Sequence, residues 1–149
     1  MVSLIAAVSA GAVIADTPKP EFAPGQVWSI NSAQPTTTKV VIGRVEAWNG
    51  KTAVHVSLTD VLVPSGASNA GARITVGHMP FEQSALAASV DQVLATGVAP
   101  PAGFEAGYRE WQSHNGGIFT IGVPKAVDVL FETLKRRPPD PVRRTNQGR

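Results

Sequence analysis

The chain lacks cysteine altogether, and it has only three histidines and one tyrosine among its 149 residues. Without cysteine it has no disulfide framework, no thiolate nucleophile and no Cys-ligated zinc. It also has no Gly-x-Ser-x-Gly elbow and no phosphate-binding loop of the Gly-x-x-x-x-Gly-Lys type. No apolar run reaches the roughly 20 residues that a transmembrane helix requires. We therefore expect no metal site, no cofactor and no transmembrane segment, and a binding protein rather than an enzyme.

Charge is distributed unevenly along the chain. The net charge is +2, but residues 135–149, KRRPPDPVRRTNQGR, carry six basic residues and one acidic residue, so residues 1–134 sum to −3. This segment has three prolines and Val142 as its one large apolar residue, so it cannot bury a core. It is predicted to be a disordered basic tail. Such a tail could contact nucleic acid or an anionic surface, or act as a solubilising extension without a partner.

The N-terminus has the features of an export signal. Residues 1–15 are uncharged, the apolar stretch from Leu4 to Ile14 has the length of a signal-peptide core, and Val13 and Ala15 suit a cleavage site before Asp16. However, no Lys or Arg precedes the apolar stretch. A periplasmic or secreted protein is the first expectation. The alternative is a cytoplasmic protein whose N-terminal segment packs on the fold. Residues 16–24 read as a Pro-rich linker, which leaves one domain over residues 25–134.

A β-hairpin is the strongest local signal in this domain. Asn49-Gly50 joins two β-rich runs, and this dipeptide favours a two-residue type I′ turn because both residues must take positive φ. With that turn, Arg44 opposes His55 on the outer face. The opposed pairs on the expected core face are Val45–Val54, Gly43–Val56 and Val41–Leu58. A change in the apolar phase after Leu58 predicts a bulge near residues 59–60.

The rest of the domain alternates strand and helix patterns. Residues 73–78 are predicted to form a strand that pairs antiparallel with residues 54–63, and residues 80–94 a helix that begins at Pro80. Phe104, Tyr108 and Trp111 have helical spacing. Residues 118–121 are predicted to form a last strand, and a final helix starts near Pro124. The expected fold class is α+β, an antiparallel β-meander sheet with two or three helices packed on one face.

Four short motifs are spread over most of this domain: FAPGQVW (22–28), VHVSL (54–58), GHMPF (77–81) and GIFTI (117–121). Together they resemble a family of uncharacterised bacterial proteins with a PGQVW start, a VHI strand, an HMPF strand-to-helix junction and an FTI final strand. The resemblance covers residues 22–134. It implies no activity, because the family has none assigned.

Two histidines are candidates for chemistry. Arg44 opposite His55 would lower the pKa of that imidazole and keep it neutral near pH 7. His55 is then either a binding residue or general base, or a half-exposed strand residue that packs beside Arg44. His78 shares a face with Val76, so it either fixes a strand-to-helix junction or lines a pocket, as Tyr108 could. Because strand residues alternate between faces, His55 and His78 are expected on opposite faces and could not share a metal ion unless a bulge lay between them.

The outer face of the hairpin is the predicted partner-binding surface. Its residues are Val40, Ile42, Arg44, Trp48 and His55. Apolar residues exposed beside Trp and Arg are typical of interaction sites. The alternative is that a third helix or the N-terminal segment covers this face.

The sequence thus predicts an exported, non-enzymatic protein that binds a protein or a small ligand in the bacterial envelope. One alternative is a cytoplasmic interaction module whose basic tail contacts nucleic acid. Another is an enzyme that uses His55 or His78.

Overall fold

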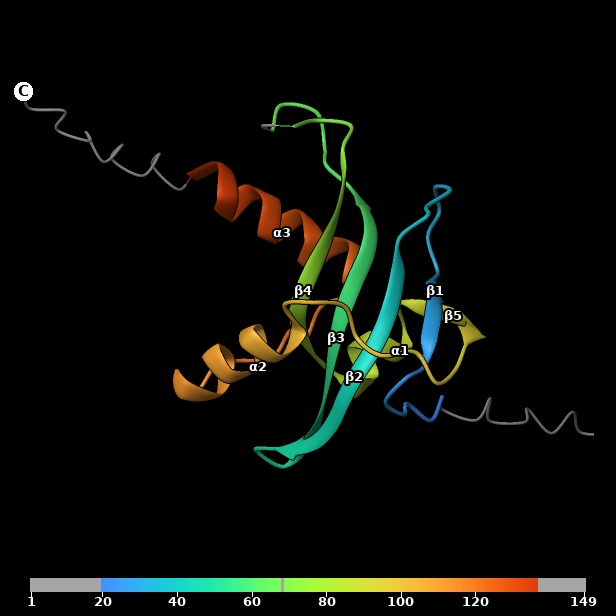
Figure 1. Ribbon diagram of the computed structural model, residues 1–149, viewed down its shortest axis with the longest axis vertical. Helices are drawn as coiled ribbons and strands as arrows, with labels where there is room; N and C mark the ends of the chain where they lie inside the picture. Colours follow the sequence, from blue (N-terminus) through green and yellow to red (C-terminus); the bar gives the residue numbers. More distant parts are fainter. Residues whose placement is uncertain (1–19, 68, 137–149) are drawn as a thin grey trace, which may run out of the picture.

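The computed structural model describes residues 20–67 and 69–136 as a five-stranded antiparallel sheet with helices against it (Figure 1). The strands are β1 (Val27–Ile30), β2 (Lys39–Trp48), β3 (Lys51–Leu62), β4 (Arg73–Glu82) and β5 (Val90–Ala95). The helices are α1 (Gln83–Ala87), α2 (Phe104–Ser113) and α3 (Val123–Arg136). The strand order is β4-β3-β2-β1-β5. The expected α+β fold class is confirmed.

The expected signal peptide, residues 16–19 of the linker and residues 137–149 of the basic tail lie outside the described residues. One boundary differs from the expectation. Lys135 and Arg136 belong to the last turn of α3, so their positive charges lie at the C-terminus of this helix. Cations are favourable there because the helix dipole leaves partial negative charge on the last carbonyl groups.

The β2–β3 hairpin forms as predicted near its turn. Asn49 and Gly50 have φ values of 45° and 74°, Trp48 pairs with Lys51, and Arg44 pairs with His55. Beyond Arg44 the register shifts by one residue, so that Ile42 pairs with Val56. The expected pairs Gly43–Val56 and Val41–Leu58 are therefore wrong.

The reason for the shift lies at Gly43, the extra residue of the bulge. A Cβ atom at this position would lie 2.2 Å from the ring of Phe104 in α2, so only glycine allows this close approach. Each residue before the bulge consequently changes face. Val40 and Ile42 point into the main core together with Val54 and Val56.

Two further bulges interrupt the β3–β4 ladder. Val56 pairs with Met79 and Leu58 pairs with Val76, which leaves Gly77 and His78 opposite Ser57. The second bulge is the one expected near residues 59–60, and Asp60 there has a φ of 54°. Because of the first bulge, His78 and Val76 lie on opposite faces of the sheet.

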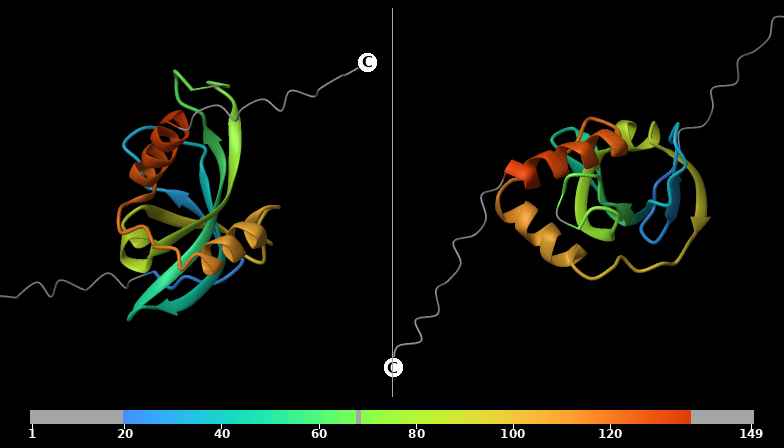
Figure 2. Two further views of the ribbon diagram at one scale, coloured as in Figure 1. Left: turned by 90° about the vertical axis from the view of Figure 1, so that its left-hand side faces the viewer. Right: turned by 90° about the horizontal axis from the view of Figure 1, so that it is seen from above.

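Both faces of the sheet are covered. The main core lies between one face and the helices α1 and α3, where the central residues are Val54, Val56, Phe81, Leu86, Val123 and Phe131. Helix α2 covers the other face, the one that carries His55, and the view from above shows α2 and α3 on opposite sides of the strands (Figure 2). The helices are thus shared between two faces, whereas the sequence analysis placed them on one.

Residues 80–94 do not form the predicted helix. β4 continues through Glu82, α1 is only five residues long, and residues 90–95 form the edge strand β5. Residues 118–121 were expected to form a strand. They form instead an isolated parallel bridge, in which Phe119 lies beside Phe81 at the end of β4. The amide N–H of Phe119 donates to the Pro80 carbonyl, and that of Glu82 donates to the Phe119 carbonyl. These long-range backbone hydrogen bonds override the local helical spacing.

Candidate functional site

Side chains from four elements meet beneath α2 and form what we call the histidine cluster. Its members are Glu46 from β2, His55 from β3, His78 from β4, and Tyr108 and Trp111 from α2. The strand residues meet because the bulge at Gly77–His78 brings His78 to the face of His55. The helix residues meet them because Tyr108 and Trp111 are three positions apart and share one side of α2.

A continuous chain of polar contacts runs through the cluster. The Nδ1 atom of His55 lies 2.9 Å from Nε2 of His78, and one of these nitrogens donates a hydrogen bond to the other. On the far side of the ring, Nε2 of His55 lies 2.9 Å from Oε1 of Glu46, in a direction outside hydrogen-bond geometry. The hydroxyl of Tyr108 donates to both carboxylate oxygens of Glu46, at 3.0 and 3.3 Å. The Glu46 carboxylate is therefore held by the Tyr108 hydroxyl and lies against the His55 ring.

Burial keeps both imidazoles neutral near pH 7. Desolvation, followed by the charge of His55, lowers the pKa of His78 to about 4. The pKa of His55 is also lowered, mainly by desolvation, although the Glu46 carboxylate acts in the opposite direction. His55 is fully buried, so neither ring of the pair gains a charge without a cost in stability.

Aromatic rings enclose the pair. The ring centroid of His55 lies 5.0 Å from that of Tyr108 and 4.6 Å from that of Trp111, both in edge-to-face arrangements. The guanidinium of Arg44 lies 4.3 Å above the Tyr108 ring, which is a cation–π contact. The indole N–H of Trp111 donates to the Gly117 carbonyl at 2.9 Å. These contacts hold the rings of α2 in place over the histidines.

A small cavity of about 220 Å³ opens beside the cluster, at the hairpin end of β2. We call it the tryptophan cleft. Its lining residues are Glu46, Ala47, Trp48, Trp111, Gln112, Asn115 and Gly116. The Glu46 side chain is 33% exposed, so the carboxylate that contacts the buried His55 also borders the cleft. A ligand in the cleft would meet the Glu46 carboxylate and the side chains of Trp48 and Trp111.

The structure divides the predicted partner-binding surface. His55 is a member of the histidine cluster, Arg44 contacts the Tyr108 ring of that cluster, and Trp48 lines the cleft. Val40 and Ile42 are fully buried in the main core on the opposite face, because the Gly43 bulge reverses their direction. These two residues therefore offer no surface to a partner.

The structure places the two residues of the predicted pocket or junction together. His78 and Tyr108 both lie in the cluster, with ring centroids 6.0 Å apart. The expectation that His55 and His78 lie on opposite faces is wrong, because strand alternation fails across a bulge.

Two members of the site, Glu46 and Trp111, were not predicted. Glu46 is two residues from Arg44 on the same strand, and Trp111 belongs to the same helical stripe as Tyr108. Strand and helix periodicity therefore place both on the correct faces, but neither pattern shows that these faces meet.

The donor set of the cluster gives no support to a metal centre. Residues 20–67 and 69–136 contain no group of three or more His, Asp or Glu side chains arranged to hold a metal ion. The nearest nitrogens of His55 and His78 bond to each other and do not converge on a third point. Over the same ranges, no helix is both long and apolar enough to cross a membrane.

Comparisons of the chain with protein-family models, with curated proteins and with solved structures find no match. The resemblance to the PGQVW-type family of uncharacterised bacterial proteins accordingly stays a prediction.

Proposed function

We propose that the protein is a non-enzymatic binding module that holds a small organic cation in the tryptophan cleft. The observation that carries this proposal is the Glu46 carboxylate, held by the Tyr108 hydroxyl at the border of a cleft with two tryptophans. Indole faces attract cations through the ring quadrupole, and a carboxylate attracts them through its charge. Both features of the cleft thus favour the same class of ligand.

The size of the cleft favours a small ligand. Its volume of about 220 Å³ is below the roughly 300–1,000 Å³ of sites that enclose drug-sized molecules. Arg44, the nearest cation to the cluster, stacks on the Tyr108 ring and does not line the cleft. Among the described residues, Glu46 is therefore the one charged side chain that lines the cleft.

The protonation behaviour of His78 favours binding over catalysis. A general base works best when its pKa lies near the working pH. The pKa of His78 is lowered to about 4, so its neutral ring has little affinity for a proton at pH 7. The His55–His78 pair is suited to positioning Glu46, and we assign it that role rather than proton transfer.

Export to the bacterial envelope remains part of this proposal and rests on residues 1–15. Fractionation of the native host, with the N-terminus read by mass spectrometry, tests it. We expect an envelope protein that begins at Asp16. An intact protein in the cytoplasm would contradict export without affecting the cleft.

Calorimetric titration tests the ligand class, with choline and a primary alkylamine as cations and glucose as a neutral ligand. We expect the cations to bind and glucose not to bind. Hydrogen bonds to charged groups are worth about 1.5–3 kcal/mol, so Glu46→Gln should weaken binding of the alkylammonium about tenfold or more. It should also weaken binding of choline, whose nitrogen has no N–H, through loss of the charge attraction. Trp111→Leu should also weaken it, through loss of the indole face.

Glu132→Gln is the matched control, since Glu132 is an exposed acid on α3, away from the cleft. It should leave cation binding unchanged. Binding of glucose with no binding of the cations would refute the proposed ligand class. Equal loss of binding in Glu46→Gln and Glu132→Gln would show a general charge effect and no site.

A further inference from the structure

A second concave surface lies at the other end of β2, where the strand begins. Its first part is an apolar groove of about 490 Å³, which we call the β5 groove. The walls include Val27 and Val41 from the sheet, Leu94 from β5, and Val98 and Pro101 from the segment that follows β5. Leu94 is 50% exposed and Val98 is 37% exposed. Apolar side chains therefore face solvent along the length of this groove.

The walls of the β5 groove are fixed by the backbone. Val27 pairs with Ala95 and Trp28 pairs with Val93, so Leu94 is the extra residue of a bulge in β5. The amide N–H of Val98 donates to the Gly25 carbonyl at 3.0 Å and ties the following segment to the start of β1. The groove is thus formed before any ligand arrives, which lowers the entropic cost of binding.

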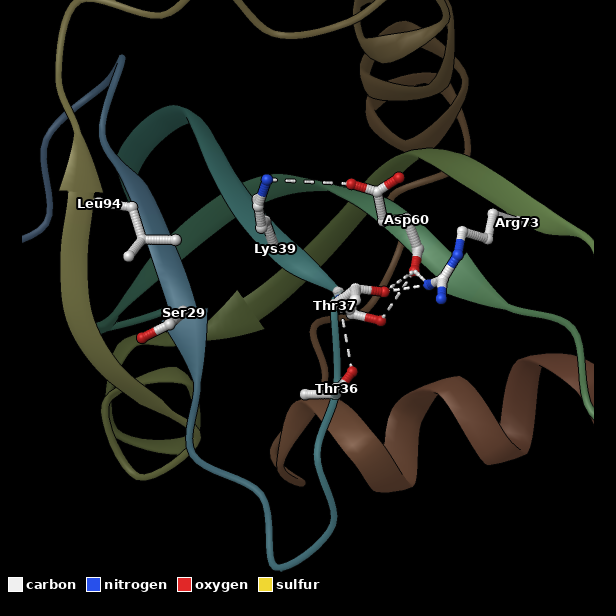
Figure 3. A pocket seen from close by; sticks show the side chains of 8 residues that line it. Ser29, Thr36, Thr37, Lys39, Asp60, Arg73 and Leu94 are labelled. Atoms are coloured by element: carbon white, nitrogen blue, oxygen red, sulfur yellow. Dashed lines mark hydrogen bonds and ion pairs between the residues drawn. The ribbon is translucent and has the colours of Figure 1, made fainter.

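A polar pocket of about 350 Å³ continues from this groove and shares Lys39 and Leu94 with it. Figure 3 shows Lys39, Asp60 and Arg73 on one side of this pocket and Leu94 and Ser29 across from them. Arg73 donates to the hydroxyl of Thr37. We call this region the threonine pocket, since Thr36, Thr37 and Thr38 also line it.

The threonine pocket carries a net positive charge. Lys39 and Arg73 are its two cations, and Asp60 is its one acid. The Lys39 ammonium and the Asp60 carboxylate are 4.0 Å apart, and both side chains are about half exposed, so this ion pair is weak. Lys39 is therefore free to move toward an anion at the end of the groove.

We propose that the β5 groove and the threonine pocket form one binding site for a free fatty acid. The alkyl chain lies along Leu94, Val98 and Val41, and the carboxylate lies at Lys39 and Arg73. The adjoining apolar and cationic surfaces complement the two parts of this ligand. A concave groove of this volume suits a single alkyl chain better than the flat surface of a bilayer.

Calorimetric titration of the protein with monomeric decanoate tests the site, beside decanol as a neutral analogue. Decyltrimethylammonium, the cationic analogue, is titrated into Glu46→Gln, whose tryptophan cleft lacks the carboxylate that would attract it. We expect decanoate to bind about tenfold more tightly than decanol, and the cation to bind most weakly. Lys39→Gln should lower decanoate affinity to the level of decanol. Val98→Ser should weaken decanoate and decanol by the same factor, because Val98 lines the β5 groove and not the threonine pocket.

Lys125→Gln is the control, since Lys125 is an exposed lysine on α3 and lines neither region. It should bind decanoate like the unchanged protein. Equal affinity for all three probes, or no binding of any, would overturn the proposal. Binding to phosphatidylglycerol vesicles without binding of free decanoate would overturn it in favour of a membrane surface. Because these residues do not line the tryptophan cleft, failure here leaves the cation proposal intact.

Discussion

At the scale of single residues, Tyr108 reports on the state of the site. It is the one tyrosine of the chain, it is buried, and its hydroxyl donates to the Glu46 carboxylate. Burial raises the pKa of Tyr108, and both the hydrogen bond to Glu46 and the Glu46 charge raise it further, whereas Arg44 lowers it. Tyrosinate formation would place a second negative charge beside a carboxylate in a partly desolvated site.

We therefore expect the alkaline titration of Tyr108, followed by tyrosinate absorbance, to have a midpoint above the ordinary value of about 10. Glu46→Gln should lower the midpoint toward that value, and Arg44→Gln should raise it further. Since one tyrosine gives the whole signal, no deconvolution is needed. Glu132→Gln should have no effect. A midpoint that is the same in Glu46→Gln and in the unchanged protein would contradict the Tyr108–Glu46 contact.

The residues of the site were partly predictable one at a time. Arg44, Trp48, His55, His78 and Tyr108 stand out in the sequence as arginine, histidine or aromatic residues within predicted strands and a predicted helix. Their meeting was not predictable, because it depends on bulges at Gly43 and at Gly77–His78. A bulge changes the face of each residue beyond it, and periodicity alone does not show where the extra residue lies.

At the scale of elements, α2 depends on glycine for its close packing on the sheet. A Cβ atom at Gly107 would lie 2.6 Å from the Cβ of His78, which the β4 backbone fixes in place. Gly107→Ala should gain about 1 kcal/mol of helix propensity. It should lose more, because overpacking a tight contact costs about 1–3 kcal/mol. We expect a net loss in the free energy of unfolding, measured by denaturant titration.

Gly117→Ala is the control for this substitution, since nothing lies within 4 Å of an added Cβ there. Its effect on stability should be less than about 0.5 kcal/mol. A Gly107→Ala protein that is more stable than the unchanged protein would mean that α2 sits farther from β4 than the structure shows.

The elements that sequence patterns predicted are those stabilised locally. The hairpin has its Asn49-Gly50 turn, and α2 and α3 have apolar stripes at helical spacing, so short-range physics is sufficient for all three. Residues 80–94 also have helical spacing, but β4 and β5 take most of them into the sheet. The partner of β5 is β1, which lies about 60 residues earlier, and the end of β4 is bridged by Phe119. No local signal encodes these two contacts.

At the scale of the whole molecule, helices lie against both faces of the sheet around β3, and this arrangement encloses two histidines. Helix α2 covers His55 and His78, while α1 and α3 cover the opposite face. In the unfolded chain each imidazole would be hydrated and would take up a proton near its ordinary pKa of 6.5. In the folded protein both pKa values are lower, so the unfolded state binds more protons below neutral pH.

The sign of the pH dependence follows from this difference. Stability is greatest above the unfolded pKa, falls as the pH drops below 6.5, and stops falling from this source below the folded pKa of His78, about 4. For His78 the full difference corresponds to roughly 3 kcal/mol. Solvent screening of the partly exposed ring reduces the expected loss to on the order of 2 kcal/mol.

Urea titrations between pH 7 and pH 4 test this expectation through the variant His78→Gln. The glutamine amide can still donate to Nδ1 of His55 but cannot titrate, so the fall in unfolding free energy should be smaller by on the order of 2 kcal/mol. His114→Gln, at the exposed end of α2, should keep the full fall. Parallel curves for His78→Gln and the unchanged protein would show that His78 is not held neutral beneath α2.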